Sequence, residues 1–320
     1  MKPDFTKAGE TVQHVFIINP NAGKRNQTAR IYEMADRLRD THGLECTCML
    51  TARPGGAEDM ARELAQRGEE VRIYACGGDG TAHEVANGIA GFPNAAMTVI
   101  PTGTGNDFLK NFGADAEKFA DAENLWDGDV LPLDLIECNG RLCLTIACNG
   151  LDARVAESVH RYSKTPALSG KGSYIVSIAA NFLFSSISRR WTVSVNGSAP
   201  EEDEYALIAL CNGRYYGGSF FPVPEARMDD GILHALLIRK VTRMEFLRLV
   251  GPYSKGKHAE LPHHLIQVFP ASEIRIRAEE DIVSCVDGEC SRSREVVMRL
   301  ADKRVNFFGP KGCSPNATAL

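Results

Sequence analysis

The sequence lacks a hydrophobic run long enough to cross a membrane. Its two longest uncharged stretches are residues 85–106, broken by four glycines and two prolines, and residues 172–188, which hold five serines and an asparagine. A spanning helix needs about 20 consecutive apolar residues. Residues 1–7 also lack the basic and then apolar order of a signal peptide. We therefore expect a cytoplasmic protein that can meet a membrane only at its surface.

The chain also lacks an excess of positive charge. Its 36 Lys and Arg residues against 41 Asp and Glu residues give a net charge of −5. A molecule of this charge has no overall field that attracts a polyanion. We expect no nucleic-acid partner, and contact with an anionic membrane would need a local basic patch.

Zinc-binding cysteine spacings are missing as well. The ten cysteines include no C-x-x-C pair, and several lie inside apolar runs, among them Cys76, Cys148 and Cys211. A reduced cysteine in such a run behaves as a small core residue. The pattern predicts free thiols in a reducing compartment.

A length of 320 residues, of which 44% are hydrophobic and 24% charged, predicts about two folded domains. In the first 130 residues, apolar runs alternate with segments of helical periodicity, and this order implies a parallel sheet covered on both faces. A helix around Ile31 to Leu38 should end at Gly43. The other predicted elements are strands at 15–18, 45–50, 71–76 and 97–100, and helices at 57–66 and 81–89.

From about residue 130 the pattern becomes rich in strands. Asn139-Gly140, between apolar runs at 133–137 and 142–147, is typical of a β-hairpin. The final strand, 305–308, fits either domain. Further predicted elements are strands at 191–195, 205–210, 233–238, 274–276 and 282–286, and helices at 173–187 and 242–250.

Neither common phosphate-binding motif is present. Gly103-x-Gly105 is followed by Phe108 where a Rossmann motif needs its third glycine, and the nearest Walker A match, residues 251–258, lacks the final Ser or Thr. Ligands of open α/β sheets bind at the carboxyl ends of the strands. The candidate loops there are residues 19–24, 77–81 and 101–107.

The composition of these loops suits a bound phosphate. Gly77, Gly78 and Gly80 permit close approach of the backbone, and the third loop interleaves two glycines with two threonines. The carboxylate of Asp79 would repel phosphate, so it caps a backbone turn, holds a metal-bound water or orients a hydroxyl group. The first loop, taken alone, is equally an ordinary turn.

Residues 77–88, read as GGDGTAHEVANG, followed by residues 101–108, read as PTGTGNDF, resemble the diacylglycerol kinase catalytic-domain family. Soluble bacterial lipid kinases match the chain in length, and sphingosine and ceramide kinases are more distant relatives. The resemblance implies an ATP-dependent lipid kinase that converts diacylglycerol to phosphatidic acid for phospholipid biosynthesis. It implies an α/β nucleotide domain of the phosphofructokinase and NAD kinase type, residues 1–130 and 304–320, and an all-β sandwich substrate domain, residues 131–303.

The resemblance also assigns site residues. It implies a Mg²⁺ on Asp230 with the carbonyls of Arg227 and Ile232, and a catalytic base at Glu289 with Asp287 beside it. Asp229 is an alternative metal ligand, and the choice of base between Asp287 and Glu289 stays open. Predicted ATP contacts are Asn19, Pro20, Gly23, Thr51, Gly77, Gly78, Asp79, Gly80, Thr81, Ala82, His83, Glu84, Thr102, Gly103, Thr104 and Asn106.

Three alternatives remain at this point. The acceptor could be another lipid alcohol, such as a sphingoid base, a polyprenol or a glycolipid, since acyl-chain pockets have no motif. A kinase of a soluble substrate, like the NAD kinases, and a protein that binds nucleotide or lipid without turnover are the others. The sequence leaves the oligomeric state open, a homodimer included.

The segment Arg239 to Lys257 is a candidate membrane contact. It holds six Lys or Arg residues against Glu245 alone, a net charge of +5, and Phe246, Leu249 and Val250 form a short apolar stripe at helical spacing. This pattern suits an interfacial helix, and equally a helix that packs the stripe onto its own domain. The stretch 161–171, with three cations near Tyr162, has the same two interpretations.

Overall fold

The computed structural model describes residues 12–162, 186–218 and 220–316. The chain divides into two compact units with boundaries between Leu135 and Ile136 and between Ala301 and Asp302, so that the first unit includes the C-terminal segment. Each unit is described by itself below. Within the described residues, no helix combines the length and apolar character needed to span a bilayer.

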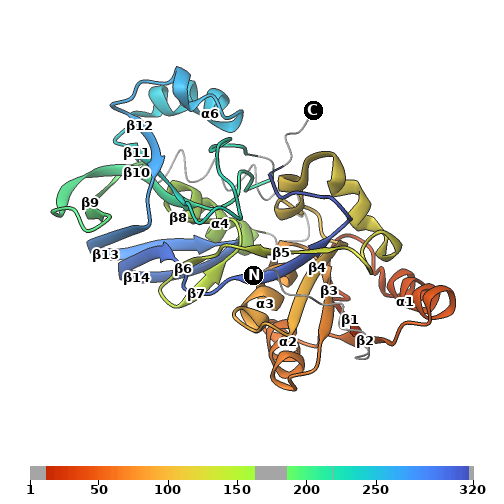
Figure 1. Cartoon of the computed structure of the whole chain (residues 1–320). Coiled ribbons are helices and arrows are strands. Elements are labelled where there is room, and N and C mark those ends of the chain that lie inside the picture. Colours follow the sequence, from red (N-terminus) through yellow and green to blue (C-terminus); the bar gives the residue numbers. More distant parts are fainter. Residues whose placement is uncertain (1–11, 163–185, 219, 317–320) are drawn as a thin grey trace. The chain divides into compact units, whose positions relative to one another are not determined.

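The first unit is built on a six-stranded sheet of order β2-β1-β3-β4-β15-β5 (Figure 1). Neighbouring strands are parallel except for β5, which runs antiparallel to β15. The C-terminal strand is thus inserted between β4 and β5. The strands are β1 (Gln13–Ile18), β2 (Cys46–Leu50), β3 (Val71–Gly77), β4 (Ala95–Pro101), β5 (Asp129–Leu133) and β15 (Val305–Gly309).

Helices cover both faces of this sheet. Helices α2 (Gly56–Gln66) and α3 (Asp79–Ile89) pack against each other on one face, and α1 (Thr28–His42) lies on the other (Figure 1). Every residue of β3 is buried, as double coverage requires. The predicted α/β fold is confirmed. The 3₁₀ helices Phe108–Ala120 and Ala122–Asn124, which follow β4, had no counterpart in the sequence prediction.

An aromatic cluster ties the C-terminal strand into this unit. The ring of Tyr74 on β3 stacks on Phe16 of β1 at 4.2 Å and meets Phe308 of β15 edge-on at 5.2 Å. The Tyr74 hydroxyl lies 2.9 Å from Nδ1 of the buried His14. These contacts place strand 305–308, which its local sequence pattern alone left open between the two domains, in the first unit.

The second unit contains a nine-stranded sheet in which β9 pairs with both β10 and β13. Along β10, Ile208 and Leu210 face one apolar cluster while Leu207 and Ala209 face another, as the alternation of side chains in a strand requires. The strands are β6 (Ile136–Cys138), β7 (Arg141–Cys143), β8 (Ile146–Gly150), β9 (Arg189–Val195), β10 (Glu201–Cys211), β11 (His234–Arg239), β12 (Ile266–Pro270), β13 (Glu273–Val286) and β14 (Glu289–Leu300).

Several predicted boundaries in this unit are wrong. The predicted strand 133–137 is divided between β5 and β6, which belong to different sheets, because the chain passes from one unit to the other at Asp134 and Leu135. The predicted strand 142–147 is likewise split into β7 and β8. Conversely, 274–276 and 282–286 are parts of the single strand β13, whose register shifts between Arg277 and Ile282.

Other elements were missed or fall outside the described residues. The sequence analysis did not predict β12, β14 or helix α4 (Leu151–Tyr162). It did predict the helix at 242–250, which is confirmed as α6 (Arg243–Ser254). It also predicted the Asn139-Gly140 hairpin, in which both residues have positive φ. The predicted helix at 173–187 and the basic stretch 161–171 lie largely outside the described residues.

Candidate active site

The three loops singled out by composition follow β1, β3 and β4, which are neighbours in the sheet. Backbone hydrogen bonds join them laterally: Asn19 N–H donates to the Cys76 carbonyl at 3.0 Å, and Thr102 N–H donates to the Gly77 carbonyl at 2.9 Å. Because parallel strands bring their carboxyl ends to one edge, the loops form a continuous rim there. This edge is where open α/β sheets bind ligands.

Glycines allow the loops to pack backbone against backbone. A Cβ on Gly103 would lie 2.5 Å from the Cα of Gly78, and a Cβ on Gly23 would lie 2.1 Å from the Thr102 carbonyl oxygen. Gly23 also has a φ of +73°. The first loop is therefore more than an ordinary turn, since it is packed against the third.

Asp79 serves the capping role, one of the three that its sequence position allowed. Its Oδ2 accepts a hydrogen bond from Asp107 N–H at 3.1 Å, and its Oδ1 accepts one from Phe108 N–H at 3.2 Å. The carboxylate thus joins the start of α3 to the start of the 3₁₀ helix after β4. This bond holds the second and third loops in one arrangement.

Within residues 77–84, the side chains of Thr81, Ala82 and His83 are buried. Thr81 Oγ1 accepts a hydrogen bond from Asn19 Nδ2 at 3.3 Å, which links this run to the first loop. A helix begins at Asp79, and the first N–H groups of a helix have no partner within it. A phosphate at this point would therefore be bound by backbone N–H groups and the positive end of the helix dipole.

Glu84 and Thr51 lie beside the start of α2. The Glu84 carboxylate accepts hydrogen bonds from Gly55 N–H at 2.9 Å and Ala57 N–H at 3.0 Å. Thr51 N–H donates to the Ile18 carbonyl at 2.9 Å. Both residues thus position the loop after β2, and sequence reasoning did not find the two amide donors that bind Glu84.

Two buried polar atoms in the third loop have no hydrogen-bond partner among the described residues. They are Thr102 Oγ1 and Asn106 Oδ1. The Asn106 amide nitrogen donates to the Gly103 carbonyl at 3.1 Å, and its backbone has a φ of 52°. Because buried polar groups are normally paired, these atoms mark a place for a polar ligand or water. Thr104 is exposed at the same loop, and Pro20 and Gly80 are half-buried.

In the second unit, Asp287 and Glu289 flank the turn between β13 and β14, and their surroundings differ. Asp287 Oδ2 accepts from Leu144 N–H at 2.6 Å, while Oδ1 accepts from Thr145 N–H at 2.9 Å, from the Thr145 hydroxyl and from Cys143 Sγ at 3.2 Å. Burial and the Asp287 charge raise the pKa of the Cys143 thiol, so it stays protonated and donates. Glu289 is exposed.

The lone pairs of Asp287 are thus committed to the loop Cys143–Thr145, whereas those of Glu289 face solvent. The two acids therefore differ in their surroundings: Asp287 joins the hairpin to this loop, and the Glu289 carboxylate is exposed. Sequence reasoning did not find this loop, because the residues that bind Asp287 are more than 140 positions away from it in the chain.

The residues predicted to hold Mg²⁺ form a turn on the surface of the second unit. Asp230 Oδ1 accepts a hydrogen bond from Ile232 N–H at 2.9 Å, and Gly231 has a φ of +74°. The Arg227 guanidinium lies 3.9 Å from Asp229 and 4.0 Å from Asp230. One carboxylate with two carbonyls and waters is a donor set that Mg²⁺ accepts. Within the described part of the chain, however, no cluster of three or more His, Cys, Asp or Glu side chains could hold a metal.

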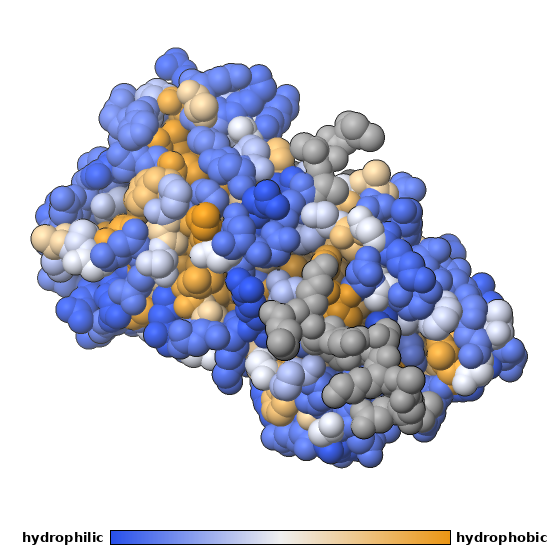
Figure 2. Space-filling model, in the orientation of Figure 1, coloured by the Kyte–Doolittle hydropathy of each residue, from blue (hydrophilic) through white to orange (hydrophobic). Residues whose placement is uncertain are grey.

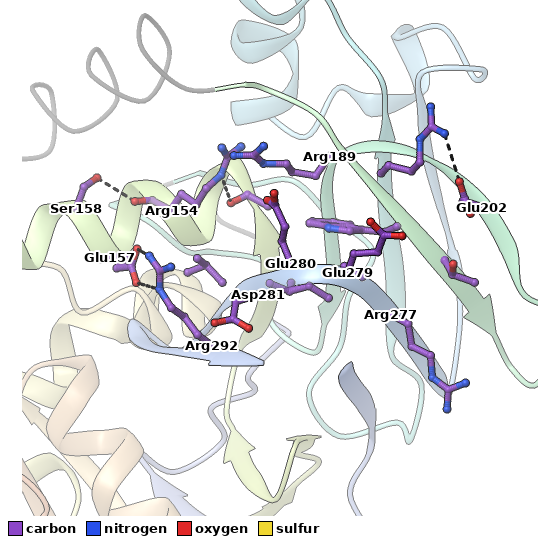
Figure 3. A pocket seen from close by; sticks show the side chains of 17 residues that line it. Arg154, Glu157, Ser158, Arg189, Glu202, Arg277, Glu279, Glu280, Asp281 and Arg292 are labelled. Atoms are coloured by element: carbon purple, nitrogen blue, oxygen red, sulfur yellow. Dashed lines mark hydrogen bonds and ion pairs between the residues drawn. The ribbon is translucent and has the colours of Figure 1, made fainter. Parts of the chain in front are cut away.

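A separate pocket of roughly 720 Å³ lies in the second unit, and none of the predicted site residues lines it (Figure 3). Its walls are largely charged, and Arg292 makes a two-point ion pair with Glu157 at 2.7 Å. Burial and the nearby Arg189 lower the pKa of Arg154 to about 10. Charged walls of this kind do not suit an acyl chain.

The glycine loops form a rim at one edge of the parallel sheet, and the comparisons with known proteins show the class of protein to which the chain belongs. Residues 13–138 match the family described as diacylglycerol kinase catalytic domain, and residues 145–308 match the YegS C-terminal NAD kinase beta sandwich-like domain. The chain belongs to the family that joins these two domains. It is therefore a kinase of the lipid kinase class, and kinases of this class use ATP.

Individual relatives agree with this assignment. A diacylglycerol kinase of Bacillus subtilis is 28% identical, with 85% of this chain and 88% of the relative aligned. A probable lipid kinase YegS-like protein of Pseudomonas aeruginosa is 32% identical over 84% of this chain and 86% of its own. The crystal structure of a diacylglycerol kinase from Bacillus anthracis shares the fold, with a TM-score of 0.67 and 21% identity over 95% of this chain and 98% of the other.

Family membership also bears on the alternatives. It favours a lipid kinase over a kinase of a soluble substrate and over a binding protein without turnover.

Proposed function

We propose that the protein transfers the γ-phosphate of ATP to the hydroxyl of diacylglycerol and so produces phosphatidic acid. The observation that supports this most strongly is the rim of three glycine loops, packed backbone to backbone. In its third loop, Thr102 Oγ1 and Asn106 Oδ1 are buried and have no hydrogen-bond partner in the described part of the chain. Such a rim offers amide donors and a hydroxyl to phosphate oxygens. The ATP contacts predicted from the sequence belong to this proposal.

Phosphoryl transfer asks the protein for positioning, neutralisation of charge and a group that takes the hydroxyl proton. The loops position the phosphates. Glu289 accepts the proton as the lipid oxygen bonds to the γ-phosphorus and the bond to ADP breaks, and Asp287 is a positioning residue for this hairpin. A bound Mg²⁺ would neutralise charge and order the turn at Asp230.

The choice of diacylglycerol rests on the relatives. The Bacillus subtilis relative is named a diacylglycerol kinase, whereas the name of the Pseudomonas aeruginosa relative leaves its lipid open. Another lipid alcohol would be compatible with the same loops and the same hairpin. The acceptor is therefore the part of the proposal that needs direct measurement.

To test the proposal, purified protein is incubated with labelled ATP, Mg²⁺ and a panel of lipid alcohols in mixed micelles. Glu289→Gln is assayed beside Glu280→Gln, which makes the same change at an exposed acid on the neighbouring strand β13. We expect labelled phosphatidic acid from the wild type and from Glu280→Gln, and none from Glu289→Gln. If another lipid is labelled instead, that lipid is the substrate. Labelled NAD with no labelled lipid would contradict the proposal.

The metal proposal needs its own experiment. Asp230→Asn and Asp229→Asn change adjacent carboxylates of one turn. If Asp230 holds Mg²⁺, its variant alone needs more Mg²⁺ to reach half-maximal activity. An equal dependence on Mg²⁺ in both variants and the wild type would show that this turn holds no functional metal.

Because diacylglycerol resides in a bilayer, the proposed reaction also requires the protein to meet a membrane surface during turnover. We include this peripheral association in the proposal. The oligomeric state, a homodimer included, is left to direct measurement.

A further inference from the structure

Helix α6 carries an unusual pair of exposed apolar side chains. Among the described residues, the two most exposed large hydrophobic side chains are Met244 at 61% and Leu247 at 54%, three positions apart on this helix. Tyr32, Leu50 and Ile232 are the other exposed ones. Hydrophilic residues cover much of the visible face of the molecule, with apolar patches between them (Figure 2). Single exposed apolar side chains are common on protein surfaces, whereas neighbouring ones are a sign of an interaction site.

The opposite side of α6 packs onto its own unit. Leu249 and Tyr253 are buried, and Phe246 packs against the cluster that contains Leu249, Leu151 and Val155. Of the two interpretations of the stripe Phe246, Leu249 and Val250, the packing one therefore holds for Phe246 and Leu249. The exposed apolar surface lies on the other side of the helix, where the sequence analysis did not place it.

Arginines flank the exposed pair on both sides. At about 100° per residue, Arg243 lies about 40° to one side of Leu247, and Arg248 lies about 40° beyond Met244. Both arginines are exposed. The outward face of α6 thus has an apolar centre between two cationic edges, which is the arrangement of a helix that lies in a membrane interface.

Three cations of the segment 239–257 that lie outside the helix are engaged in ion pairs. Outside the helix, Arg239 pairs with Asp203, Lys240 with Glu204 at 2.6 Å, and Lys257 with Glu260 at 3.0 Å. These acids lie outside residues 239–257, so the net charge of +5 counted for that segment did not include them.

The other three cations of the segment are Arg243, Arg248 and Lys255, with Glu245 as the opposing acid. Glu245 is engaged in the capping box with Thr242, which also holds the first turn of the helix rigid. The exposed Arg243 and Arg248 thus lie on α6 beside the apolar pair, and the exposed Lys255 directly follows the helix.

We propose that α6 is the membrane-docking surface of the protein, with an anionic lipid bilayer as its partner. Met244 and Leu247 enter the boundary between headgroups and acyl chains, while Arg243 and Arg248 contact lipid phosphates. This inference rests on the proposed function, because docking here would bring the kinase to a substrate that resides in the bilayer.

Vesicle binding tests the surface directly. The full chain is sedimented with vesicles of phosphatidylcholine and phosphatidylglycerol in equal amounts, and with vesicles of phosphatidylcholine alone. The double variant Met244→Ser, Leu247→Ser should bind the mixed vesicles about tenfold more weakly or worse. Tyr32→Ser, an exposed apolar residue of the first unit, should bind like the wild type. Arg248→Gln should reduce the preference for anionic vesicles.

A second variant gives a positive signal that a folding defect cannot imitate. Leu247→Trp should bind mixed vesicles at least as tightly as the wild type, and its added tryptophan fluorescence should shift to shorter wavelength when vesicles are present. The natural protein has only two tryptophans, so the added signal is measurable. No shift, or unchanged binding of the double serine variant, would overturn the docking proposal.

Kinase assays on two forms of diacylglycerol distinguish a failure of the docking proposal from a failure of the proposed function. With a short-chain diacylglycerol dispersed in water, kcat/KM of the double serine variant should equal that of the wild type, and with long-chain diacylglycerol in mixed vesicles it should fall with the loss of binding. Equal losses on both acceptors would overturn docking through α6. Absence of activity on either acceptor in the wild type would refute the proposed function, while the binding results would still decide the docking surface.

Discussion

The carboxylate of Asp79, in the first turn of α3, accepts hydrogen bonds from the backbone N–H groups of Asp107 at 3.1 Å and Phe108 at 3.2 Å. The start of α3 follows β3, and the segment at Asp107 and Phe108 follows the adjacent strand β4. One side chain thus fixes the spacing of two glycine loops. The presence of an acid in this glycine loop is thereby explained by the architecture of the loop, since the carboxylate accepts hydrogen bonds from backbone amides.

Asp79→Ala should lower the free energy of unfolding by about 1–2 kcal/mol, the usual cost of losing such a cap, and should weaken ATP binding. Asp79→Asn keeps one acceptor oxygen and should lose less of both. Denaturant titration and calorimetric ATP binding measure the two effects. If ATP binding collapses in Asp79→Asn while stability is unchanged, the carboxylate acts on the nucleotide and not as a cap.

Gly103→Ala tests the close packing of the loops. Its Cβ would lie 2.5 Å from the Cα of Gly78, so backbone has to move. We expect a loss of about 1–3 kcal/mol of stability, the usual cost of overpacking, with a clear loss of ATP affinity. Gly251→Ala, in an open position on α6, is the control and should leave ATP affinity unchanged. Normal ATP binding by Gly103→Ala would show that the nucleotide binds elsewhere.

Mutation of the two acids at the β13 to β14 turn, Asp287 and Glu289, should affect stability and turnover differently. Asp287→Ala leaves the donors of Leu144 and Thr145 without their acceptor and should cost about 1–3 kcal/mol of stability. Glu289→Gln alters an exposed group and should change stability by less than about 0.5 kcal/mol while abolishing turnover. Thermal unfolding and kcat measured on both variants decide the matter, and the reverse pattern would exchange their roles.

His14 should make the fold sensitive to mild acid. Burial and the neighbouring Arg72 lower its pKa from 6.5 to about 4. The unfolded chain therefore binds a proton below pH 6.5 that the folded chain does not bind until about pH 4, and the contribution of neutral His14 is lost as the pH falls through this window.

Between pH 7 and pH 5 this contribution amounts to about 2 kcal/mol. His14→Gln removes the titrating group. Between pH 7 and pH 5, the unfolding free energy of this variant should therefore fall by about 2 kcal/mol less than that of the wild type. Denaturant titrations at both pH values measure the difference. Parallel pH dependence in the variant and the wild type would mean that His14 is not the responsible group.

Much of the first unit could be predicted from local patterns. Each predicted strand and helix before Pro101 is present, because apolar periodicity and stop signals act over short distances, as at Gly43, whose φ of +67° ends α1. Secondary structure was predicted less well where a strand is held by pairing with segments that are distant in the chain. Strand β14 is mostly polar or exposed, and it is held by pairing with β13 and β6.

The sequence by itself determined the family to which the chain belongs, because glycines at strand ends and acids in a turn form motifs that need no folded context. Only the tertiary structure decided how those residues are used. It directed Asp79 toward amides of the next loop, committed Asp287 to the loop at Thr145, and placed Met244 and Leu247 on the outer side of α6. The reason is physical: hydrogen-bond partners and burial depend on segments that are distant in the chain, and a local pattern contains no information about them.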